Sequence, residues 1–101
     1  MKLPDDPFVI ELLPEFIESW LGDIDKYNEY EEKQQTDELY RMAHTIKGSC
    51  YQFGLNDLGD MGIELMSFAK IPDWDKSRQL YKSIKNRFIE INDYLIKHNI
   101  K

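Results

Sequence analysis

The residues best suited to chemistry lie in the stretch AHTIKGSCYQFG, residues 43–54, which has the apolar spacing of a helix. In a helix, His44, Lys47 and Gly48 share one face because they are three and four residues apart. A neutral imidazole is a nucleophile near pH 7, and nearby cations can pair with the oxygens of a phosphoryl group. Glycine is unfavourable inside a helix, but its missing side chain clears space for a large partner. The pattern therefore favours phosphoryl transfer at the imidazole.

The helical wheel predicts that this imidazole faces solvent. Each residue turns a helix by about 100°, so Phe53, nine positions after His44, lies on the opposite side of the helix. The predicted core face consists of Leu39, Met42, Ile46, Cys50 and Phe53. The exposed face is then expected to surround His44 with Tyr40, Arg41, Lys47, Gly48 and Tyr51.

Other site chemistries find less support in the residues. A metal site needs a second ligand at helical spacing, and none accompanies His44, so we expect no metal. No glycine-rich phosphate loop opens a helix, so the chain shows no means of binding ATP. His98, near the C-terminus, is interpreted as a solvated side chain. A solvated histidine without a function also remains an open interpretation of His44.

Composition indicates a single domain, residues 1–101, with a hydrophobic content of 42%. Residues 1–40 hold 12 acids and 3 bases, whereas residues 41–101 hold 7 acids and 10 bases. The net charge of −6 argues against a nucleic-acid surface. No stretch approaches the roughly 20 apolar residues of a membrane span, so we expect a soluble, cytoplasmic protein. The single cysteine, Cys50, excludes an intrachain disulfide and a cysteine-based zinc cage, and we expect it to be buried.

The elements that position the histidine are all expected to be helices, because no period-2 alternation is present. Asp6 and Pro7 predict the start of a short helix through FVIELL, and Pro14 predicts a kink or restart. A longer helix is expected from Pro14 to the EEKQQ stretch. The histidine-bearing helix is expected to run from a Thr36 cap to Phe53.

Gly54 is suited to a left-handed cap after that helix, and Asn56 to the start of the next one. Gly59 and Gly62 within that next helix predict close contact between helices. Pro72 and Asp73 mark a break before the last helix, whose expected core stripe is Ser77, Tyr81, Ile84, Phe88, Ile91 and Leu95. The predicted fold class is therefore all-α: an antiparallel up-down-up-down four-helix bundle with a short N-terminal capping helix.

The stretch HTIKGSCYQFGL resembles the signature of histidine phosphotransfer (HPt) domains of two-component phosphorelays. The matching positions are His44, Ile46, Lys47, Gly48, Ser49 and Gly54. The resemblance implies that His44 accepts a phosphoryl group on its distal ring nitrogen, that Lys47 assists phosphoryl binding, and that Gly48 lets a receiver domain approach. Cys50 and Tyr51 depart from the pattern, because small residues are common at both positions. A bulky Tyr51 beside His44 narrows access or selects a partner.

The resemblance also implies the partners. They are response-regulator receiver domains and a hybrid sensor histidine kinase, which would dock on a surface that includes Tyr40, Arg41, Ser49 and Tyr51. The chain would be a phosphocarrier and not an enzyme, with no cofactor of its own, and Mg²⁺ would belong to the receiver. We expect a monomer.

Two alternatives stay open at this point. The chain is a helical adaptor that binds a receiver or kinase without accepting phosphate, or it is one domain of a larger hybrid or chemotaxis kinase. The first alternative predicts that binding survives replacement of His44.

Overall fold

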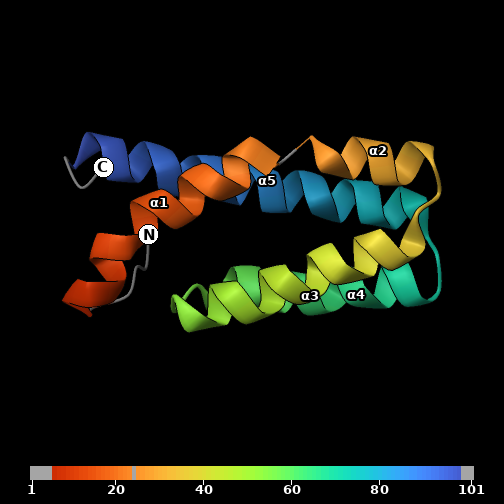
Figure 1. Cartoon of the computed structure of the whole chain (residues 1–101), viewed down its shortest axis with the longest axis horizontal. Coiled ribbons are helices and arrows are strands. Elements are labelled where there is room, and N and C mark those ends of the chain that lie inside the picture. Colours follow the sequence, from red (N-terminus) through yellow and green to blue (C-terminus); the bar gives the residue numbers. More distant parts are fainter. Residues whose placement is uncertain (1–5, 24, 99–101) are drawn as a thin grey trace.

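The computed structural model describes residues 6–23 and 25–98, which form five helices and no strand. The helices are α1 (Pro7–Asp23), α2 (Lys26–Glu32), α3 (Thr36–Gln52), α4 (Asn56–Lys70) and α5 (Trp74–Lys97). In Figure 1, α1 and α2 run in the same direction along α5, while α3 and α4 form the other layer. With α1 and α2 as one column, the four columns alternate in direction, so the predicted all-α bundle is confirmed.

The predicted separate capping helix is wrong, because α1 continues through Pro14. Asp6 does cap it, since the Phe8 amide donates a hydrogen bond of 2.9 Å to the Asp6 carboxylate. Proline inside a helix costs about 3 kcal/mol. Leu13 and Ile17 are fully buried on either side of it, and this packing holds both halves of α1 against the bundle. Figure 1 shows the first turns of α1 at an angle to the rest.

The predicted continuous helix from Pro14 to the EEKQQ stretch is also wrong, because α1 ends at Asp23 and α2 begins at Lys26. Gly22 and the two aspartates that follow it in this segment have low helix propensity, which explains a break here.

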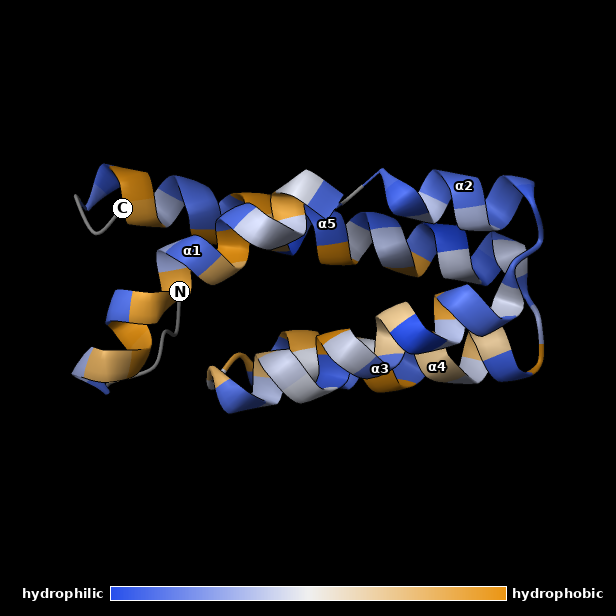
Figure 2. Ribbon diagram, viewed as in Figure 1, coloured by the Kyte–Doolittle hydropathy of each residue, from blue (hydrophilic) through white to orange (hydrophobic). Residues whose placement is uncertain are grey.

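The short helix α2 is attached to α5 by side chains. The rings of Tyr27 and Tyr81 stack with their centroids 4.3 Å apart. Arg78 Nε donates to both carboxylate oxygens of Glu31, at 3.0 and 3.1 Å. Because most of α2 is hydrophilic (Figure 2), these two contacts define its place on the bundle.

Helices α3 and α4 begin one residue differently from the sequence prediction. Thr36 and Asn56 are the first helical residues, and the caps are Gln35 and Leu55, neither of which makes a side-chain capping bond. Leu55 is buried, so apolar packing outweighs the side-chain cap at that position. Gly54 has a φ of 75°, which confirms the predicted left-handed residue.

The core lies between the two layers and confirms the predicted apolar stripes. All six predicted stripe residues of α5 are buried, as are four of the five on α3; Phe53 is half-buried and stacks on Phe16, with centroids 4.3 Å apart. Ala43 joins the core face of α3, which the prediction missed. Among the described helices, none combines the length and apolar character needed to cross a bilayer.

Cys50 is expected to be protected from alkylation in the folded protein. It is fully buried, and burial raises the pKa of its thiol from 9.0 to about 12. We expect iodoacetamide at pH 8 to leave the native chain unlabelled and to label it rapidly in denaturant, as measured by intact mass.

The same shift predicts a pH dependence of stability. Between pH 9 and 12 the unfolded thiol ionises while the folded one stays protonated, so this contribution to stability is complete below pH 9 and is lost as the pH rises. A Cys50→Ala chain should lose less stability over this range. Equal losses in the two chains, or fast native alkylation, would contradict a buried thiol.

Candidate functional site

Helices α3 and α4 touch through their backbones next to the histidine. A Cβ atom added to Gly62 would lie 2.7 Å from the Lys47 backbone nitrogen and 3.0 Å from the Ala43 carbonyl oxygen. The absence of a side chain at Gly62 therefore permits this contact, which confirms the predicted close approach. At Gly59 the neighbour differs, because an added Cβ would lie 2.8 Å from Cζ of the Tyr51 ring.

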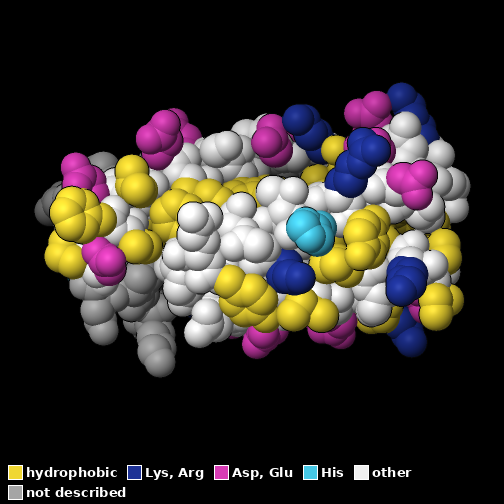
Figure 3. All heavy atoms as spheres, turned by 60° about the horizontal axis from the view of Figure 1, so that its bottom comes forward, with side chains coloured by type: hydrophobic (Ala, Val, Ile, Leu, Met, Phe, Trp, Pro, Cys, Tyr) yellow, Lys and Arg dark blue, Asp and Glu magenta, His cyan; other side chains and the backbone are white. Residues whose placement is uncertain are grey.

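His44 is exposed on the outer face of α3, as predicted. Ala43 and Ile46, on the other side of the helix, are fully buried. Figure 3 shows this face of the molecule, with hydrophobic side chains and a lysine or arginine beside a histidine. The imidazole is thus presented to an incoming molecule and is not part of the core.

Lys47 and Gly48 lie on this face but differ in their surroundings. Lys47 is half-buried and, among the residues that the structure describes, has no ion-pair partner. Its ammonium group is therefore available to an added anion. Gly48 is exposed, and a Cβ added there would meet nothing within 4 Å. The space over Gly48 is open to a partner.

Arg41, the other predicted cation, is already engaged. Its side chain is 77% exposed, and Nη1 lies 3.1 Å from the Glu38 carboxylate, one turn earlier on α3. Such an exposed pair is weak, about 0.5 kcal/mol, so Arg41 can be released at small cost. Tyr40 is 39% exposed, and Ser49 is half-buried. Of these two basic side chains, Lys47 is the one without an acidic partner in residues 6–23 and 25–98.

Tyr51 is half-buried, and its side chain extends from α3 to α4. Its hydroxyl donates a hydrogen bond to the Asp60 carboxylate, which raises the pKa of the Tyr51 hydroxyl. Its ring covers Gly59. The sequence pattern placed Tyr51 near His44 but did not predict its contacts with α4.

Ile63 is a surface residue that the sequence prediction missed. Gly62 packs against α3 between Ala43 and Lys47, so the next residue, Ile63, lies at the level of His44. Its side chain is 48% exposed. The available signal was an isoleucine outside the apolar stripe of α4, and an exposed isoleucine here suits a protein interface.

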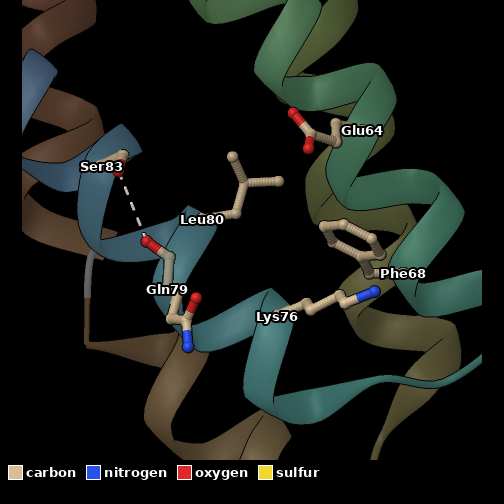
Figure 4. Close-up of a pocket in the computed structure, with 6 residues that line it drawn as sticks. All are labelled: Glu64, Phe68, Lys76, Gln79, Leu80 and Ser83. Carbon is tan, nitrogen blue, oxygen red and sulfur yellow. Dashed lines mark hydrogen bonds between the residues drawn. The ribbon is translucent and has the colours of Figure 1, made fainter.

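Two grooves differ in their distance from the face of α3 that carries His44: the first is lined by neighbours of His44, and the second is not. A groove between the first two helices and α3 is lined by Trp20, Tyr30 and Met42, together with the neighbours of His44, Arg41 and Thr45. The groove in Figure 4 lies between α4 and α5 and includes Phe68 and Lys76. None of the predicted site residues lines that second groove.

A comparison with family models decides the relationship. The model described as "Hpt domain" matches residues 11–95, which include the whole histidine stretch. The chain belongs to the Hpt domain family. No curated protein and no solved structure matches it significantly. Hpt domains are phosphocarrier modules that interact with receiver domains and kinases in phosphorelays.

Proposed function

We propose that this Hpt domain accepts a phosphoryl group on His44 from the aspartyl phosphate of one receiver domain and passes it to another. The observation that carries the proposal is the exposed imidazole beside Lys47, which has no ion-pair partner among the described residues, and the open space over Gly48. These are the features that a transfer between two proteins requires: access, a nucleophile and a cation for the phosphoryl oxygens.

The phosphoryl transfer needs no general base, because no proton has to leave the attacking nitrogen. The lone pair of the distal ring nitrogen of His44 forms the N–P bond while the P–O bond to the receiver aspartate breaks. The aspartate carboxylate leaves with that electron pair, and the proton on the other ring nitrogen of His44 stays in place. Lys47 pairs with the phosphoryl oxygens, and Mg²⁺ is supplied by the receiver. The reverse reaction loads the second receiver.

The docking surface is formed by the exposed parts of α3 and α4. Tyr40, Arg41, Ser49 and Tyr51 surround the imidazole along α3, and Ile63 adds an apolar side chain from α4. Basic side chains at His44 complement the acidic, Mg²⁺-binding pocket of a receiver. We propose that the partners are receiver domains and a hybrid sensor histidine kinase, that the domain acts as a monomer without an ATP site, and that it works in the cytoplasm.

A second candidate function is an adaptor that binds a receiver without accepting phosphate. Ile63 and Tyr40 favour binding whether or not the imidazole reacts, since both expose apolar surface. This candidate keeps all docking contacts and removes only the chemical step. The two functions therefore differ in one measurable quantity, phosphate on the chain.

The test is phosphate transfer followed by intact mass. Receiver domains are phosphorylated with acetyl phosphate and Mg²⁺, freed of the donor, and mixed with the wild-type chain or with His44→Gln. We expect one acid-labile, base-stable phosphate on the wild type and none on His44→Gln. The matched control is His98→Gln, whose ring lies 4.2 Å from that of Tyr94 at the end of α5 and should leave transfer intact.

Binding without phosphate transfer would favour the adaptor function. In that case several receivers bind the chain, no phosphate transfers from any of them, and His44→Gln binds as tightly as the wild type.

A further inference from the structure

Tyr51 occupies the far side of the open space over Gly48. It lies three residues after Gly48 and seven after His44, so the three residues share one face of α3. The family pattern favours a small residue at this position, whereas this chain has a large aromatic one. A partner that approaches over Gly48 must therefore meet the Tyr51 ring.

Two contacts with α4 hold the ring in one orientation. The first is the notch at Gly59, where an added Cβ would lie 2.8 Å from Tyr51 Cζ, so any side chain there would displace the ring. The second is the hydrogen bond from the Tyr51 hydroxyl to the Asp60 carboxylate. The large Tyr51 ring on α3 thus fits against Gly59 on α4, which has no side chain. The ring is therefore held against α4 by a packing contact and a hydrogen bond.

Asp60 adds an uncompensated negative charge at the same place. It is exposed, and in residues 6–23 and 25–98 its carboxylate has no cationic partner. Asp57, one turn earlier on α4, is by contrast paired with Arg87 of α5. The surface beyond Gly48 therefore consists of an aromatic ring packed on α4 and a carboxylate that has no cationic partner among the described residues.

We propose that Tyr51 and Asp60 select the receiver, an inference that rests on the proposed phosphotransfer function. The accepted receiver presents a small or flat apolar residue to the Tyr51 ring and a lysine or arginine to Asp60. A receiver with a bulky residue or an acid at that contact is rejected.

The physical basis is pre-organisation combined with repulsion. A tyrosine already held in place loses little conformational freedom when a partner docks, so its apolar contact contributes to binding at low entropic cost. A bulky receiver side chain would have to displace the ring from the Gly59 notch and break the bond to Asp60. An acidic side chain would face the Asp60 carboxylate, and like charges at an interface favour rejection.

The test compares transfer from a panel of phosphorylated receivers whose predicted contact residue is small, bulky, basic or acidic. The measured quantity is the ratio of kcat/KM between the best and the worst receiver. We expect Tyr51→Ala to lower this ratio at least tenfold, chiefly by admitting bulky receivers. Tyr51→Phe should keep most of the ratio, because the ring still fits the notch. Asp60→Asn should slow transfer from receivers with a basic contact residue, and the rate of that transfer should depend less on salt concentration.

Controls separate selection from folding and from the chemistry of His44. Tyr94→Ala removes a half-buried tyrosine from α5 and should leave the ratio unchanged. Direct phosphorylation of His44 by phosphoramidate needs no receiver, so its rate measures access to the imidazole alone, and the kcat/KM values of each variant are divided by that rate before the ratio is compared. Gly59→Ala, which displaces the ring but retains it, should lower the ratio as Tyr51→Ala does.

An unchanged ratio in Tyr51→Ala, Gly59→Ala and Asp60→Asn would overturn the selection proposal while leaving phosphotransfer standing. Absence of transfer from every receiver to the wild type would instead overturn the proposed function, and this inference with it.

Discussion

Gly62→Ala is expected to lower the free energy of unfolding by about 3 kcal/mol, the upper part of the usual range for overpacking. The added methyl would lie 2.7 Å from the Lys47 nitrogen and 3.0 Å from both the Ala43 oxygen and Lys47 Cα. All three are backbone atoms, so no side-chain rotation relieves the contact and α3 and α4 must separate. The helix-propensity gain of alanine over glycine, about 1 kcal/mol, is too small to offset this. Urea unfolding followed by circular dichroism measures the change.

Gly48→Ala is the matched control, because it makes the same chemical change on a helix in open space. An added Cβ at Gly48 has nothing within 4 Å, so we expect a gain of about 0.5–1 kcal/mol from propensity alone. The two substitutions should therefore have opposite signs. A Gly62→Ala chain as stable as the wild type would show that α3 and α4 do not touch through their backbones.

Helical periodicity predicted the parts of the fold that depend on one buried face. Ser77 and Tyr81 were placed in the core stripe of α5 and are buried, and His44 was placed opposite the core and is exposed. These predictions succeeded because burial of an apolar stripe dominates the energy of an amphipathic helix, and its period can be read directly from the sequence.

Local propensity did not predict helix boundaries that are determined by tertiary packing or by the geometry of a turn. Pro14 was expected to produce a kink or a restart, and the restart is wrong because the burial of Leu13 and Ile17 keeps α1 continuous. Thr36 was expected to cap α3, yet the preceding turn contains Gln34 with a φ of 54° and makes Gln35 the cap. Neither result could be read from nearby residues, because the deciding energies come from tertiary contacts or from the conformation of the turn.

The sequence predicted which side chains share the outer face of α3, but it did not predict which partners they contact. Gly59 and Gly62 were both interpreted as points of close approach, but one faces the Tyr51 ring and the other faces backbone. Arg41 was expected beside His44, and its ion pair with Glu38 shows that it has a competing partner. Partners on another turn or another helix depend on the register between elements, which a single sequence does not specify.

Lys47→Met is expected to slow phosphoryl transfer to His44 by about 100-fold, the usual cost of removing one pre-organised charge from a reacting centre. Methionine retains an unbranched apolar stem, so the half-buried part of the side chain stays packed and the free energy of unfolding should change by less than about 0.5 kcal/mol. Rapid-quench measurement of transfer from one phosphorylated receiver tests the rate, and urea unfolding tests the stability.

Arg41→Met is the matched control for this substitution. Arg41 is also a cation three residues from His44, but it is mostly exposed and paired with Glu38, so we expect its loss to slow transfer by less than about fivefold. Equal effects of the two substitutions would mean that general positive charge, and not Lys47 itself, promotes the reaction. A large effect of Lys47→Met alone would assign the phosphoryl contact to Lys47, because this lysine has no ion pair with any described acid that must break before it binds an incoming anion.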